Sequence, residues 1–198
     1  MKRIVLVISL LLMTSTAWGE GLSVGLTANN RVVGAECGFL TSSPFGAVEV
    51  AGGVTYNKDR YTITNGLVSV KSDSLSPGLR YGLGFKYVMG SVKNKPRTEE
   101  GDLSAIGFNL ELSYELPATI NPSSTPIELI FDTTLSPESI SFDETESYMD
   151  FTSGLKIYLI ENAYVSVTHT YLDMEFENGG RTWGRYINET MVGIVLSL

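Results

Sequence analysis

The chain has 198 residues, of which 43% are hydrophobic, and its formal net charge is −8. This length favours a single domain. The acidic balance excludes a nucleic-acid-binding protein, which needs clustered Lys and Arg, and the single cysteine, Cys37, excludes an internal disulfide.

Residues 1–19 predict a cleaved secretory signal peptide. Lys2 and Arg3 form a basic start, residues 4–13 are apolar apart from one serine, and Gly19 ends a small-x-small cleavage site. Removing these two positive charges takes the net charge from −8 to −10 and leaves residues 20–198 as one domain. No later apolar run approaches the roughly 18 residues of a spanning helix, so a mature membrane form would have to be a β-barrel.

Alternation of apolar and polar residues predicts an all-β chain, and no segment after the leader has an amphipathic helix pattern. The predicted turns include a two-residue hairpin turn at 161–162 and a Gly-rich connection at 178–181. The first two hairpins have the weakest boundaries, so eight strands is the alternative to ten. The ten predicted strands are 21–29, 33–40, 45–56, 61–71, 78–89, 103–116, 127–133, 148–160, 163–177 and 182–198.

The last predicted strand is apolar on one face up to Leu198. The alternating residues between Thr190 and Leu198 are all apolar or β-branched, and the opposite face is mixed and small. Such a strand suits the closure of an outer-membrane barrel, in which the last strand pairs with the first. The departure is that Leu198 stands where these strands most often have Phe. The alternative is the last strand of a periplasmic β-sandwich.

Charged residues in mid-strand favour the barrel over the sandwich. Each is flanked on its own face by Gly, Ser, Thr or Asn, as expected for a narrow lumen in which charges of both signs pair. Eight to ten strands leave little room beyond side chains, so we expect salt bridges to plug the lumen and exclude a wide pore. The predicted lumen charge network is Glu36, Glu49, Arg80, Lys86, Glu111, Asp150, Lys156 and Glu189.

Aromatic residues near strand ends also favour a membrane barrel, since aromatic girdles lie at both membrane interfaces. Tyrosine favours strands in any case, so this evidence is weaker than the charge pattern. The predicted girdle residues are Tyr56, Tyr61, Tyr87, Tyr114, Tyr148, Tyr158, Trp183 and Tyr186.

Catalytic and metal-binding patterns are absent from the sequence. His169 is the only histidine, and the residues two positions away, Val167 and Tyr171, rule out the His–Ser spacing of lipid A deacylases. The acidic loop 136–146 could bind Ca²⁺ or Mg²⁺, but it lacks EF-hand spacing, and a solvated loop is favoured. We therefore predict no enzyme activity, no cofactor and no metal.

The C-terminal part resembles the YfaZ family of Gram-negative outer-membrane proteins. The resemblance lies in the loop 136–142 (Ser-Pro-Glu-Ser-Ile-Ser-Phe), in Tyr148, in 154–158, and in the turn 161–162 with the strand after it. It covers residues 126–198 well and the N-terminal half only in general style. It implies a small outer-membrane barrel and carries over no site residues.

The sequence thus predicts a small antiparallel up-and-down transmembrane β-barrel, monomeric, with a structural or surface-interaction role. Its expected partners are outer-membrane lipid and lipopolysaccharide and, during insertion, the barrel-assembly machinery. Two other functions stay open. One is a narrow channel or transport accessory, and the other is a soluble periplasmic β-barrel or sandwich that binds a ligand.

Overall fold

The computed structural model describes residues 21–44, 46–73, 76–94, 100–117, 120–121 and 125–198, so the predicted signal peptide lies outside the described residues. A short 3₁₀ helix, η1 (Glu138–Ile140), follows β7. The strands are β1 (Gly21–Ala28), β2 (Val32–Ser43), β3 (Gly46–Asn57), β4 (Tyr61–Asp73), β5 (Leu79–Lys93), β6 (Glu100–Glu115), β7 (Ile127–Ser136), β8 (Ser141–Asp143), β9 (Thr145–Ile160), β10 (Ala163–Asn178) and β11 (Arg181–Ser197).

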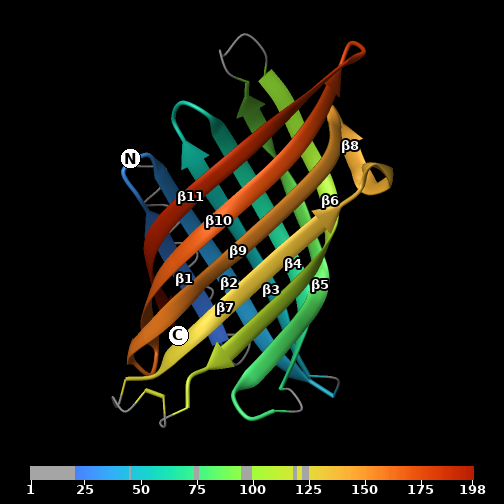
Figure 1. Cartoon of the computed structure of the whole chain (residues 1–198). Coiled ribbons are helices and arrows are strands. Elements are labelled where there is room, and N and C mark those ends of the chain that lie inside the picture. Colours follow the sequence, from blue (N-terminus) through green and yellow to red (C-terminus); the bar gives the residue numbers. More distant parts are fainter. Residues whose placement is uncertain (1–20, 45, 74–75, 95–99, 118–119, 122–124) are drawn as a thin grey trace.

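The ten long strands form one closed antiparallel barrel (Figure 1). Neighbouring long strands in the chain are neighbours in the sheet, β5 pairs with β6, and β1 pairs with the last six paired residues of β11, so the ring closes. The short β8 pairs only with β6. The predicted up-and-down barrel with ten strands is confirmed, and the alternative of eight strands is wrong. Within the described ranges, no helix is long and apolar enough to cross a membrane.

The barrel has two distinct ends, named here as they are drawn in Figure 1. At the upper end, β10 turns into β11, and η1 and β8 lie between β7 and β9. At the lower end, β1 begins, β11 ends, and the turn at 161–162 joins β9 to β10. Both described termini of the sheet therefore meet at the lower end, as an even strand count requires.

The outer wall is apolar around the whole barrel. All ten long strands place large apolar side chains on it, and Leu83 and Phe108 are 59% and 58% exposed. The alternation that predicts the strands therefore points its apolar face outward. Other exposed members include Leu26, Val33, Val50, Val68, Phe85, Phe131, Phe151, Val167, Val192 and Ile194.

The interior divides into two layers, which the alternation pattern does not predict. Its upper half holds an apolar core, in which Val88, Val92, Met174 and Phe176 have no exposed surface. The small residues and the paired charges that we expected along the whole lumen lie in the lower half, whereas the upper half also holds Arg185, which is 8% exposed between Trp183 and Ile187 on β11. The other core members are Val32, Tyr61, Ile63, Leu103, Ala105, Tyr148, Leu172 and Ile187, and Trp183 and Met191 pack against them.

The predicted aromatic girdle is wrong for four of its residues. Tyr61 and Tyr148 are 4% exposed and belong to the internal core. Tyr158 donates a hydrogen bond to a carboxylate inside the barrel, and Trp183 stacks on a core phenylalanine with ring centroids 4.5 Å apart. These aromatics fill the lumen because they have inward parity. Tyr56, Tyr87 and Tyr186 are exposed on the outer wall.

Candidate functional site: the lower lumen

A cavity of about 330 Å³ occupies the lower lumen. The first three strands line it with small residues, among them Gly34, Gly38 and Ala51, and the later strands supply lysines and carboxylates. Gly25 leaves room for the side chain of Glu36, whose carboxylate oxygen lies 2.5 Å from the position that a Cβ would occupy there. The small side chains of β1–β3 leave room for the cavity, and charged side chains line it.

Lys71 forms the first charge cluster. Its Nζ lies 2.5 Å from Glu49 Oε2 and 2.6 Å from Glu111 Oε2. The Ser69 hydroxyl donates a hydrogen bond of 3.1 Å to the other oxygen of Glu111. One lysine on β4 therefore bridges carboxylates from β3 and β6, which are separated by three strand interfaces.

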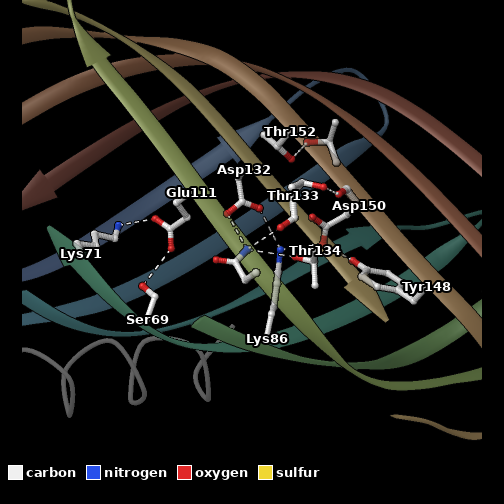
Figure 2. A network of polar contacts seen from close by, with 12 residues as sticks. Ser69, Lys71, Lys86, Glu111, Asp132, Thr133, Thr134, Tyr148, Asp150 and Thr152 are labelled. Atoms are coloured by element: carbon white, nitrogen blue, oxygen red, sulfur yellow. Dashed lines mark hydrogen bonds and ion pairs between the residues drawn. The ribbon is translucent and has the colours of Figure 1, made fainter. Parts of the chain in front are cut away.

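Lys86 forms the second and more deeply buried cluster (Figure 2). Its Nζ lies 2.9 Å from Asp150 Oδ2 and 3.6 Å from Asp132 Oδ1. The Tyr148 hydroxyl donates to the same Asp150 oxygen at 2.7 Å, and Asn109 Nδ2 donates to Asp132 at 2.9 Å. The other Asp150 oxygen, Oδ1, is buried and has no hydrogen-bond partner in the described part of the chain.

Lys156 forms a third cluster nearer the lower end. Its Nζ lies 3.9 Å from Glu128 Oε2, and the Tyr158 hydroxyl donates to that oxygen at 2.6 Å. The same ammonium lies 5.2 Å from the ring centroid of Tyr164, within cation–π range. The β7 carboxylate is thereby held by two groups of β9.

Only one pair within the predicted network is in direct contact, Lys86 with Asp150. Arg80 lies at the lower rim, where its side chain is half-exposed and pairs with Glu115 at 3.6 Å. Glu36 lines the large cavity. Glu189 accepts a hydrogen bond of 3.2 Å from Asn29 Nδ2.

Sequence reasoning missed three residues of these clusters: Lys71, Glu128 and Asp132. Glu128 and Asp132 alternate along β7 with the apolar residues Leu129 and Phe131, which face outward. The alternation therefore predicts that both carboxylates point into the barrel. Lys71 stands at the end of its predicted strand and was left out of the network for that reason.

A smaller cavity of about 130 Å³ lies where the charged layer meets the apolar core. It shares Thr55, Asn65, Lys86, Thr152, Thr170 and Met191 with the large cavity, so the two adjoin. Asp150 and Glu189 line its polar side, and Ile63, Leu172 and Ile187 line its apolar side.

Carboxylates outnumber lysines in the described lower lumen. The lysines are Lys71, Lys86 and Lys156, and the carboxylates are Glu36, Glu49, Glu111, Glu128, Asp132, Asp150 and Glu189. The field inside the barrel therefore favours cations over anions.

The remaining candidate residues lie outside the lumen. His169 is exposed, and its Nδ1 lies 2.9 Å from the Thr190 hydroxyl oxygen. In the predicted acidic loop, Glu144 accepts the backbone N–H of Asp102 at 3.1 Å. No group of three or more His, Cys, Asp or Glu among the described residues is arranged to hold a metal ion.

The loop that carries the family resemblance forms a short strap beside β6 at the upper end (Figure 1). It contains η1 and β8, and β8 pairs Ser141 with Ala105 and Asp143 with Leu103. The Ser136 hydroxyl donates to the Ile106 carbonyl at 2.8 Å. The motif thus has a structural role in this chain.

Comparison with solved structures finds other barrels of membrane proteins. The chain is similar to the NanC porin, with a TM-score of 0.45 and 11% identity over 90% of this chain and 99% of that one. It is similar to the KdgM porin, with a TM-score of 0.41 and 10% identity over the same shares. The translocator domain of the autotransporter NalP from Neisseria meningitidis aligns with a TM-score of 0.28 and 13% identity, over 95% and 92%.

No protein-family model matches the sequence, and no curated protein matches it either. The resemblance to the YfaZ family therefore has no support from these comparisons. With TM-scores below 0.5, the porins do not identify a substrate for this barrel.

Proposed function

We propose that this protein is a small outer-membrane β-barrel with a sealed lumen, and that its role is structural or binding rather than catalytic. The observation that carries this proposal is the apolar outer wall, to which all ten long strands contribute. Soluble monomers rarely expose a contiguous apolar patch above a few hundred Å². In a bilayer the same wall faces hydrocarbon, and the pairing of the first strand with the last closes the sheet.

A sealed lumen is supported by the upper core. Val32, Val88, Val92 and Phe176 come from three different strands, β2, β5 and β10, and have no exposed surface. Water and ions would have to pass between these packed side chains to cross the barrel. A narrow channel, the other function open from the sequence, is therefore less well supported than a closed barrel.

The proposed partners follow from the location. Outer-membrane lipid would contact the apolar wall, lipopolysaccharide would contact the upper rim, and the barrel-assembly machinery would insert the chain after cleavage of its signal peptide. The proposed upper end is extracellular, because both described ends of the sheet lie at the lower end and bacterial barrels keep theirs in the periplasm. Membership in the YfaZ family is proposed on the resemblance over residues 126–198, of which the 136–142 loop is the most specific part.

The test is fractionation of native cells followed by electrophoresis of unboiled and boiled samples. We expect the protein in the outer-membrane fraction, with a mobility that shifts on heating because a detergent-resistant barrel unfolds only when boiled. Recovery in the soluble periplasm with no heat-dependent shift would overturn the proposal. The apolar wall would then need a different partner.

A further inference from the structure

The smaller cavity of the lumen has one polar and one apolar side. Ile63, Leu172, Ile187 and Met191 form the apolar side at the base of the core. The polar side consists of Lys86, Asp150, Glu189 and the side chains of Thr55, Asn65, Thr152 and Thr170. A cavity of this composition suits an amphipathic molecule better than water alone.

The charges around this cavity are not balanced by the chain. Lys86 is shared between Asp150 and Asp132, so one ammonium serves two carboxylates. Glu189 accepts a hydrogen bond from the neutral amide of Asn29, and no ion pair joins it to a described Lys or Arg. The cavity therefore has an excess of negative charge.

A second observation points to a missing donor. Asp150 is 2% exposed, lines this cavity, and leaves its Oδ1 without a hydrogen bond in the described chain. A buried carboxylate oxygen without a donor is costly, so a bound group with N–H donors would be stabilised there. An ammonium supplies both the positive charge and the donors.

We propose that the smaller cavity binds a small organic ammonium, whose charged end meets Asp150 and Glu189 and whose apolar end meets Ile63, Leu172 and Ile187. A metal ion fits less well, because the described chain holds no group of three metal-ligating side chains and the cavity is apolar on one side. The site lies inside the barrel, so it does not depend on the proposed location in a membrane.

The size of the cavity limits the ligand. Its volume is about 130 Å³, and an engineered protein cavity of roughly 150 Å³ takes up benzene. A single small ring or a short alkyl chain therefore fits. The ligand would enter through the adjoining cavity of about 330 Å³, which reaches solvent since Glu36 is exposed within it.

The experiment is an NMR titration of the folded barrel in detergent, with methyl groups of Ile63, Ile187 and Met191 as reporters. The probes are butylammonium, its neutral counterpart 1-butanol, and butyrate. We expect butylammonium to shift these methyls and to bind at least about tenfold more tightly than 1-butanol, with butyrate weaker still. The outward methyl of Ile194 controls for partition into the micelle.

Two variants assign the site. Glu189→Gln should weaken butylammonium binding by about tenfold and leave 1-butanol unchanged. Its matched control, Glu175→Gln, alters a carboxylate outside both cavities and should change neither affinity. Thr55→Leu fills the cavity and should abolish binding of both probes, which keeps the test decisive if Glu189→Gln does not fold.

Binding of butylammonium no tighter than that of 1-butanol would overturn the proposal, as would an affinity that Glu189→Gln and Thr55→Leu both leave unchanged. Inner-methyl shifts caused by potassium as strong as those caused by butylammonium would instead assign an inorganic cation. Every sample is first checked for heat-dependent mobility. A folded barrel that binds no ammonium contradicts this inference alone and leaves the proposed function standing.

Discussion

At the scale of single residues, Lys86 and Asp150 form a buried charge pair inside the barrel. The side chain of Lys86 is 16% exposed and that of Asp150 is 2% exposed, so both charges are largely removed from water. Such a pair adds little net stability over an apolar pair, yet removing one partner leaves the other charged and desolvated. The consequence is a strong asymmetry between single and combined substitutions.

Lys86→Met should lower the free energy of unfolding by roughly 3–5 kcal/mol, because it leaves Asp132 and Asp150 without their shared cation. Urea unfolding of the barrel in lipid vesicles, followed by heat-dependent mobility, measures this loss. Adding Asp132→Asn and Asp150→Asn should recover a large part of it, because no buried charge then remains.

The control for this loss is Arg80→Met at the lower rim. The pair of Arg80 with Glu115 is half-exposed at 3.6 Å, and its loss should cost up to about 1 kcal/mol. Equal costs for the two methionine variants would show that the buried cluster contributes nothing beyond an ordinary surface pair.

Leu83→Arg tests the environment of the outer wall. Leu83 is 59% exposed in the middle of β5, and an arginine facing hydrocarbon there should cost roughly 2–4 kcal/mol. The inward Leu103→Arg, placed in the apolar core, should abolish folding. The folded fraction in vesicles measures both. A change within about 0.5 kcal/mol for Leu83→Arg would mean that water faces this wall.

Parity predicts the direction of a charged side chain but not its partner. Glu49 and Glu111 have inward parity in the sequence, whereas their common partner Lys71 depends on which residues reach the same height across β3, β4, β5 and β6. That height is set by the stagger of neighbouring strands, which the alternation of one strand does not contain. For this reason the inward face was predictable and the individual salt bridges were not.

At the scale of elements, β11 closes the sheet through a short interface with β1. The pairing runs from Ser23 with Ser197 to Ala28 with Val192. On its other edge β11 pairs with β10 along nearly its whole length. The predicted role of the last strand in closure is therefore confirmed, and this interface depends on few backbone hydrogen bonds.

Ile194→Pro should prevent closure of the barrel. Ile194 is paired with Leu26 on one side and Val165 on the other, and proline removes the backbone N–H in the middle of this sheet. We expect no heat-dependent mobility shift for this variant. Ile194→Val is the control and should retain the shift, and a folded proline variant would show that closure does not need this strand.

Strand lengths were underestimated at the upper end. The patterns predict 78–89 and 103–116, whereas β5 continues to Lys93 and β6 begins at Glu100. In this region both faces of the strand carry apolar residues, such as Val88 and its neighbour Met89, so the apolar/polar alternation is lost. The pairing of β5 with β6 nevertheless continues from Ser91 with Asp102 to Lys93 with Glu100. The loss of apolar/polar alternation along these strands marks the start of the internal apolar core. This loss is the feature of the sequence from which the core could have been predicted.

At the scale of the whole molecule, the interior of the barrel is packed at one end and hollow at the other. Its upper half is packed mainly with apolar side chains, and its lower half holds a cavity with an excess of carboxylates. Folding of this interior is assisted by the apolar core, which buries side chains from both the N-terminal and the C-terminal strands. The same core lies between the two mouths of the barrel, which is why we propose that the lumen is sealed.

The purified barrel in a planar bilayer should therefore give no resolved single-channel currents. Replacing the stacked pair Phe176 and Trp183 by alanine removes the bulk of one side of the seal and should produce discrete openings. These currents should be cation-selective, because ions would then cross the lower lumen, where Glu36 and its neighbouring carboxylates outnumber the lysines. Val88→Ser provides a second and milder opening variant if the double variant folds poorly. Currents from the native barrel equal to those of both variants would show that the upper core does not seal the lumen.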